Sequence, residues 1–116
     1  MRHGLDEALA AVARREDEMF RHTRAWVAIN SDTDNVVGVN DVGARLAEAF
    51  ALPGIAHEVL PAEGRGDHHV WHTAAAGPRV LLVGHHDTVF PPGHFEGWRE
   101  EGGRAIGPGA LDMKGG

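Results

Sequence analysis

The apolar run Val80-Leu81-Leu82-Val83 is the feature that most constrains the fold of this 116-residue chain. The run is short and is bounded by Pro78 and Gly84. A continuous run of β-branched and leucine residues is typical of a strand buried on both faces, as in a parallel or mixed sheet covered by helices. The sequence therefore predicts an α/β fold in which Arg79–Val83 is a central strand.

Polar residues begin where this run ends, with His85, His86 and Asp87. Sites in open α/β sheets form just outside the carboxyl ends of strands. In an extended chain, His85 and Asp87 project to one side and His86 to the other. A His-x-Asp pair offers an imidazole ligand for a metal and a carboxylate that accepts its second N–H. A structural or surface pair is the alternative interpretation.

A second polar stretch follows the tight turn Gly107-Pro108-Gly109, which allows a close approach of the backbone. Asp112 comes three residues later. Its carboxylate has two oxygens and is able to bridge two cations, as a site with two metals requires. The alternative role for an isolated aspartate at this position is a helix N-cap.

Together these stretches resemble the aminoacylase/carboxypeptidase family of cocatalytic zinc exopeptidases, which includes glutamate carboxypeptidases, succinyl-diaminopimelate desuccinylases and acetylornithine deacetylases. The resemblance rests on Gly84-His85-x-Asp87-Thr88-Val89-Phe90-Pro91 and on Arg104-Ala105-x-Gly107-Pro108-Gly109-x-x-Asp112-x-Lys114-Gly115-Gly116. The upstream segment Ile29-Asn30-Ser31-x-Thr33-x-Asn35 is similar to the opening of the glutamate carboxypeptidase branch.

The resemblance implies a three-layer α/β/α zinc-exopeptidase-like catalytic domain, incomplete and without the inserted lid domain. Residues 1–116 would form the amino-terminal part of this one metallohydrolase domain. His85 is expected to bind one metal and Asp87 to be the catalytic-site carboxylate that orients it. Asp112 is expected to bridge both metals and to be followed by a cis peptide bond. The ions would be two divalent cations, zinc first, with cobalt or manganese as alternatives. A shared ion would place the His85 nitrogen and the Asp112 oxygen roughly 3–4 Å apart.

The implied activity is cleavage of an amide bond next to a free carboxylate, in small peptides or N-acyl amino acids, by a full-length enzyme that is a homodimer. The family's catalytic Glu-Glu pair, a further acidic ligand and a late histidine follow the position of Asp112. We therefore expect the chain as given to be inactive. Glu100-Glu101 precedes Asp112, and we expect this pair to lie in a solvated turn. Two alternatives are a non-catalytic binding or assembly module derived from such an enzyme, and a free-standing α/β domain.

Composition excludes several other classes. A net charge of −6 without a basic patch argues against nucleic-acid and anionic-membrane partners. The absence of cysteine excludes a thiolate zinc site and a cysteine nucleophile. Ser31, the only serine, has no strand–turn–helix elbow around it, which argues against a serine triad. No apolar run reaches membrane-spanning length and the amino terminus has no secretory pattern, so we expect a cytoplasmic protein.

Periodicity predicts two helices. The first runs from Leu5 to about Ala28 and the second from Val36 to Phe50, because apolar residues recur at helical spacing in both. Gly38 and Gly43 each weaken the second helix by up to about 1 kcal/mol relative to alanine. We therefore expect tertiary packing to hold this helix.

Strands are predicted over Ile55–Leu60, His68–Thr73 and Arg104–Ile106. Two helices are too few to cover a central sheet, so we expect an open edge and exposed apolar surface. His68, His69 and His72 are predicted surface histidines rather than ligands, because His69 and His72 would face opposite sides of a strand.

Overall fold

The computed structural model describes residues 2–116. Its helices are α1 (Arg2–Ala13), α2 (Glu16–Val27) and α3 (Val36–Ala49), and its strands are β1 (Ile55–Leu60), β2 (His68–Thr73), β3 (Arg99–Glu101) and β4 (Arg104–Ile106). The strands form two separate antiparallel hairpins, β1–β2 and β3–β4. The predicted second helix and the three strands at these positions are confirmed.

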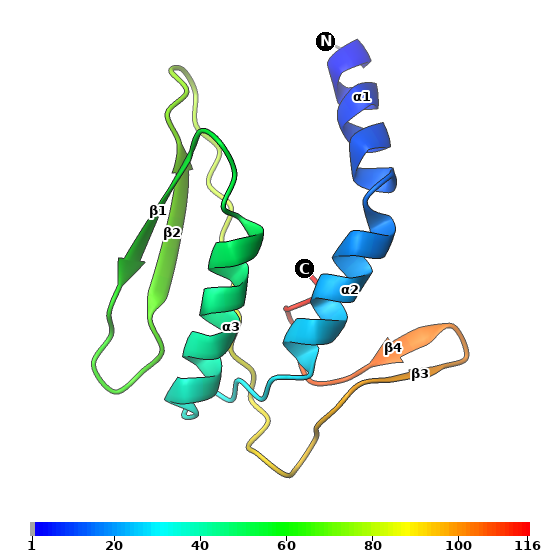
Figure 1. Ribbon diagram of the computed structural model, residues 1–116, viewed down its shortest axis with the longest axis vertical. Coiled ribbons are helices and arrows are strands. Elements are labelled where there is room, and N and C mark those ends of the chain that lie inside the picture. The colour runs from blue at the N-terminus through cyan, green and yellow to red at the C-terminus, as the bar shows by residue number, and fades with distance from the viewer. Residues whose placement is uncertain (1) are drawn as a thin grey trace.

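The elements form two arms joined at one end. In Figure 1, α1 and α2 make one arm, while α3 and the β1–β2 hairpin make the other; the β3–β4 hairpin projects beside the end of α2. The carboxyl-terminal residues lie against α2, where a Cβ built on Gly115 would be 3.6 Å from Thr23 Cγ2. The residues that follow the long loop after β2 therefore return to the junction of the two arms.

The prediction of a single first helix is wrong, because the chain divides it at Arg14 and Arg15. The Arg15 N–H donates to the Val12 carbonyl at 2.9 Å, which is a three-residue turn instead of a four-residue one. Arg15 has φ −103° and ψ 8°, outside the helical region. The apolar stripe of α1 also has no covering partner, since Leu5 and Leu9 are 60% and 59% exposed.

Helix α3 is anchored by close contacts at its glycines. The Asn35 side chain caps the helix by accepting from the Gly38 N–H at 3.2 Å. A Cβ at Gly38 would lie 1.8 Å from the Asn30 carbonyl oxygen, and one at Gly43 would lie 2.5 Å from His69 Nε2. The approach at Gly38 requires glycine because its neighbour is backbone, whereas the His69 ring at Gly43 is a side chain and could shift. The helix has packing partners, with Val39 and Val42 buried, and the expectation that packing stabilises it stays a prediction.

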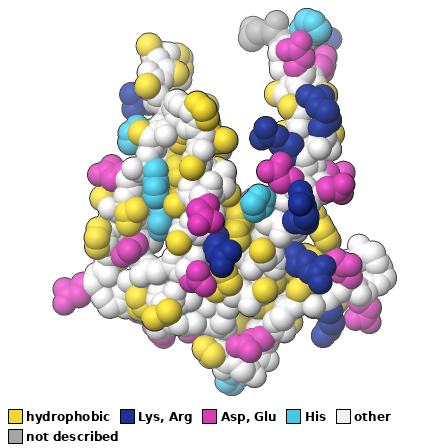
Figure 2. Space-filling model, in the orientation of Figure 1, with side chains coloured by type: hydrophobic (Ala, Val, Ile, Leu, Met, Phe, Trp, Pro, Cys, Tyr) yellow, Lys and Arg dark blue, Asp and Glu magenta, His cyan; other side chains and the backbone are white. Residues whose placement is uncertain are grey.

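The β1–β2 hairpin carries a stack of aromatic rings on the face that meets α3. His57 pairs with Trp71 across the hairpin, and their rings stack at 4.9 Å. His69 stacks on His57 at 5.1 Å, and Phe50 packs on Trp71 at 5.2 Å. Figure 2 shows histidine side chains gathered on this arm. The hairpin is thus attached to α3 largely through rings.

The prediction of a central strand at Arg79–Val83 is wrong. No described segment pairs with these residues, and Val80, Leu81, Leu82 and Val83 are 87%, 84%, 88% and 80% exposed. An isolated segment has no neighbour to accept its backbone N–H groups or to cover its side chains, so it does not become a strand. The expected exposed apolar surface is confirmed, although no open-edged sheet forms around it.

The interior is small. Within residues 2–116, the buried hydrophobic side chains are Val27, Val39 and Val42. The radius of gyration is 15.9 Å, against about 13 Å for a compact domain of this length. The molecule is a thin body of 48 × 41 × 19 Å. The three-layer α/β/α domain therefore stays a prediction. No helix in residues 2–116 is both long and apolar enough to cross a membrane.

Candidate functional site

The segment that follows the apolar run is held by the loop between α2 and α3. We call residues Asn30–Asn35 the anchoring loop. Asp32 and Thr88 form a parallel bridge, in which the Thr88 N–H donates to the Ser31 carbonyl at 2.8 Å and the Thr33 N–H donates to the Thr88 carbonyl at 2.9 Å. Thr88 and Ser31 are 4% and 0% exposed. This bridge fixes the backbone of the His-x-Asp segment.

Side chains of the anchoring loop complete the attachment. The Ser31 hydroxyl donates to the His86 carbonyl at 2.7 Å, and the Asn30 amide donates to the Phe90 carbonyl at 3.0 Å. Asn35 Nδ2 donates to the Asn30 carbonyl and to Asn30 Oδ1, at 3.1 and 3.0 Å. The residues that cap α3 therefore also order the loop that carries the site.

His85, Asp87 and Asp112 are brought together by hydrogen bonds, and we call these three residues the His85 series. His85 Nδ1 lies 3.1 Å from Asp87 Oδ1, and His85 Nε2 lies 2.8 Å from Asp112 Oδ1. The second distance is shorter than the 3–4 Å expected across an ion, because the imidazole and the carboxylate are in direct hydrogen-bond contact. The carboxylate of Asp87 is engaged on its other oxygen by the Thr33 hydroxyl, at 2.6 Å. Asp112 is 81% exposed and faces solvent.

The electrostatics of the series follow from these contacts. Burial lowers the pKa of His85, but the hydrogen bonds to Asp112 and Asp87 outweigh it, so the net shift is upward. Burial raises the pKa of Asp87, yet the Thr33 hydroxyl and the His85 ring stabilise the carboxylate and hold its pKa below the usual range. Both carboxylates therefore favour the protonated form of the ring, and a cation that binds Nε2 of that form must displace a proton.

The carboxyl-terminal segment is anchored by Lys114. This side chain is 5% exposed, and its ammonium group donates to the Ile29 carbonyl at 2.7 Å. Burial lowers the pKa of Lys114 to about 8. Its stem passes over Gly109, where a Cβ would be 3.0 Å from Lys114 Cδ and where φ is +82°. The peptide bond after Asp112 is cis, as the resemblance implied.

His86 lies outside the series, as predicted. Its ring meets the His69 ring edge-on at 5.7 Å, on the side of the β1–β2 hairpin. Burial lowers the pKa of His86 and of His69. In the part of the chain that the structure describes, His86 Nε2 is buried without a hydrogen-bond partner. His57 and His69 are hydrogen-bonded through their rings at 2.9 Å, and His69 is half-buried, so the prediction that His69 is a surface histidine is wrong.

The other candidates are exposed. His68 and His72 are exposed on β2, as predicted. Glu100 and Glu101 are also exposed, but they belong to β3 and not to a turn, and Glu100 accepts a hydrogen bond from the Trp98 indole at 3.2 Å. Neither glutamate lies in the His85 series.

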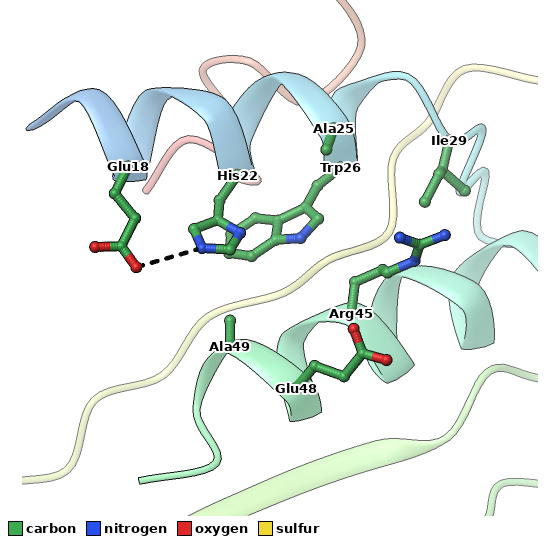
Figure 3. A pocket seen from close by; sticks show the side chains of 8 residues that line it. All are labelled: Glu18, His22, Ala25, Trp26, Ile29, Arg45, Glu48 and Ala49. Carbon is green, nitrogen blue, oxygen red and sulfur yellow. Dashed lines mark ion pairs between the residues drawn. The ribbon is translucent and has the colours of Figure 1, made fainter. Parts of the chain in front are cut away.

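A cavity of about 620 Å³ lies elsewhere, between α2 and α3. Figure 3 shows Trp26 and His22 on one side and Arg45 and Glu48 on the other. His22 pairs with Glu18 at 3.8 Å. None of the three predicted site residues lines this cavity, so the His85 series is a surface site at the loop junction.

The series fits a metal only in part. Imidazole nitrogen and carboxylate oxygen are both common zinc donors, and both converge here at an exposed position. Among residues 2–116, however, no group of three or more histidine, aspartate or glutamate side chains has an arrangement that holds a metal ion. The described residues thus present one imidazole nitrogen and one carboxylate oxygen, from His85 and Asp112, with Asp87 behind the imidazole.

Comparison with known proteins gives a short but specific likeness. The chain is 50% identical over 48 residues to a succinyl-diaminopimelate desuccinylase of Methylobacterium nodulans, a match that covers 35% of the chain and 12% of the relative. It is 51% identical over 49 residues to the same enzyme of another Methylobacterium, covering 36% of the chain and 12% of that relative. No family model and no solved structure matches. The chain therefore shares one segment with enzymes named as desuccinylases, and this segment spans about one eighth of their length.

Proposed function

We propose that this chain is part of the catalytic domain of a two-metal hydrolase, in which His85 and Asp112 bind metal and Asp87 orients His85. The observation that carries the proposal is the convergence of His85 Nε2 on Asp112 Oδ1 at 2.8 Å, with Nδ1 facing Asp87. A carboxylate on Nδ1 keeps the N–H there and leaves the lone pair of Nε2 for a cation.

The reaction class follows from the shared segment. The desuccinylases that match are named for removal of a succinyl group. We infer an amide bond next to a free carboxylate as the substrate class, in N-acyl amino acids or, in a carboxypeptidase, in small peptides. Two divalent ions, zinc first with cobalt or manganese as alternatives, would polarise the scissile carbonyl and lower the pKa of a water to about 7. The full-length enzyme would be a homodimer.

The described residues account for only part of such a site. Catalytic zinc has three protein ligands and a water, whereas this chain offers two. Further ligands and a general base would come from sequence that follows Asp112 in longer relatives. We therefore expect the 116-residue chain to bind zinc weakly, with a dissociation constant in the micromolar range or higher. This corresponds to a binding free energy of no more than about 8 kcal/mol. We expect no hydrolysis of N-acyl amino acids.

Titration calorimetry with zinc tests the assignment on the wild type, His85→Ala and Asp112→Asn. Both substitutions should abolish measurable binding, while His94→Ala, a matched change in an exposed loop, should leave it intact. Binding should also weaken as the pH falls through the raised pKa of His85, because the proton competes for its nitrogen. Zinc affinity that neither site substitution alters would refute the metal assignment.

A second candidate is a non-catalytic binding or assembly module derived from such an enzyme. It is favoured by the exposure of Val80–Val83 and of Leu111, which is 91% exposed. Apolar surface of this kind is typical of a chain that packs against another. Sedimentation with and without zinc separates the two candidates: self-association in the absence of any zinc binding would support the module.

A further inference from the structure

The anchoring loop sends one side chain into the His85 series, that of Thr33. Its hydroxyl lies 2.6 Å from Asp87 Oδ2, while Asp87 Oδ1 lies 3.1 Å from His85 Nδ1. One carboxylate is thus held on both oxygens, by the anchoring loop on one side and by the imidazole on the other.

Thr33 is itself fixed independently of Asp87. Its N–H donates to the Thr88 carbonyl at 2.9 Å, beside the parallel bridge of Asp32 and Thr88. The hydroxyl also lies 3.2 Å from the Thr88 carbonyl. A hydroxyl has one proton to donate, and the shorter contact to the charged carboxylate is the stronger one. The β-branched side chain restricts rotation about χ1.

The orientation of the Asp87 carboxylate depends on a hydrogen bond of this kind. Its side chain is 34% exposed, and the terminal torsion of an aspartate is broad and roughly two-fold. A bond to Oδ2 selects one orientation of the carboxylate and so the place of Oδ1. That oxygen in turn sets the plane of the His85 ring, whose other nitrogen faces Asp112.

We propose that Thr33 is a positioning residue, whose hydroxyl fixes the Asp87 carboxylate so that His85 presents Nε2 beside Asp112. Its relevance to metal binding rests on the function proposed above. The geometric part concerns the metal-free chain and is testable without any ion.

The first experiment observes the ring protons of His85 by NMR in the metal-free chain at about pH 6, where both nitrogens carry protons. In Thr33→Val, the Nδ1 proton should exchange with water about tenfold faster, because its acceptor is no longer held. The Nε2 proton, which faces Asp112, should also exchange faster, because the ring is no longer held with this nitrogen beside the carboxylate. Thr33→Ser keeps the hydroxyl and should restore slow exchange, and Thr73→Val, at the exposed end of β2, should have no effect.

The second experiment measures zinc affinity by calorimetry. Thr33→Val should weaken binding about 5- to 10-fold, near the lower end of effects reported for groups that support metal ligands. Thr33→Ser should stay within about twofold of the wild type. In an Asp87→Ala background the Thr33→Val effect should vanish, because Thr33 acts through Asp87. A loss that is the same in both backgrounds would mean a merely structural role and would overturn the proposal.

Thr33→Ala is the second variant if valine, whose methyl would meet Asp87, prevents folding. Unchanged exchange of the Nδ1 proton in a folded Thr33 variant overturns the proposal. If the wild type binds no zinc, the proposed metal function fails, while faster exchange in Thr33→Val still supports positioning by Thr33. If the wild type binds zinc and Thr33 substitutions do not change the affinity, the metal assignment is supported and the proposed role of Thr33 is refuted.

Discussion

Two neighbouring segments of this chain have opposite environments. Val80–Val83 has apolar side chains that are at least 80% exposed, while Ser31 and Thr88, at the contact between the anchoring loop and the next segment, are 0% and 4% exposed. Hydrophobicity alone would predict the reverse. The anchoring loop supplies hydrogen-bond partners to His86, Thr88 and Phe90. The apolar run meets no covering surface in residues 2–116. Burial depends on a partner as much as on residue type.

The largest loss of stability is expected from filling the space at Gly38, which would remove the contacts that bury the anchoring loop. A Cβ there would lie 1.8 Å from the Asn30 carbonyl, so Gly38→Ala should displace the anchoring loop and lower the free energy of unfolding by about 2–3 kcal/mol. Gly4→Ala is the matched control, because its Cβ would meet nothing within 4 Å in α1. Denaturant unfolding followed by circular dichroism measures both. Equal stability of the two variants would contradict the close packing described for the loop.

A smaller loss is expected at Ser31, whose hydroxyl donates to the His86 carbonyl at 2.7 Å. Ser31→Ala leaves that buried carbonyl with one partner fewer and should cost about 1–3 kcal/mol. The residue is 0% exposed, so water is not expected to replace the hydroxyl without rearrangement. Denaturant unfolding also measures this variant. A loss under about 0.5 kcal/mol, the usual effect of a surface substitution, would contradict the prediction for Ser31→Ala.

Acidification should lower the stability of the arm that α3 and the β1–β2 hairpin form. Burial, and next the neighbouring His57, lower the pKa of His69 below its value of 6.5 in the unfolded chain. Stability that depends on neutral His69 is therefore fully present above 6.5 and is lost as the pH falls through that value toward the folded pKa. We expect the denaturation midpoint to fall between about pH 7 and pH 5. His69→Gln removes the titrating group, so its midpoint should depend less on pH; an unchanged slope would exclude His69 as the cause.

The smallest effect is expected in the apolar run. Leu82 is 88% exposed, so Leu82→Asp should change stability by less than about 0.5 kcal/mol. It should also reduce binding of a hydrophobic dye, since the charge interrupts the exposed surface. Val42→Ala, at a side chain that is 0% exposed, is the contrasting change and should cost more than about 1 kcal/mol. A large loss in Leu82→Asp would mean that the run is covered in solution.

Local patterns predicted much of the secondary structure. The helical spacing of Val36–Phe50 and the strand-forming residues of His68–Thr73 are properties of adjacent residues, and both elements form where expected. The break at Arg15 was missed because helical periodicity continues across it. Val80–Val83 was misassigned because a strand requires a neighbour, and periodicity carries no information about whether one exists.

The site was predictable in its principal residues and not in its supports. Spacing paired His85 with Asp87, the family resemblance implied that Asp112 joins them, and the structure brings the three side chains together. Their roles as ligands stay predictions. The contribution of Thr33 was missed, because it contacts a residue 54 positions away. The sequence did offer a signal, since Thr33 belongs to the upstream segment that carried part of the resemblance.

Acylation of Lys114 offers a way to measure local opening near the site. This residue is the only lysine, so an amine-acylating reagent has a single side-chain target. That amine is 5% exposed while it donates to the Ile29 carbonyl, and acylation requires it to leave this bond. The extent of labelling at Lys114 therefore reports how often this side chain leaves the carbonyl of Ile29, the residue before the anchoring loop. A mass spectrum taken over a time course of acylation would read out the opening of the site directly, with no metal, substrate or activity required.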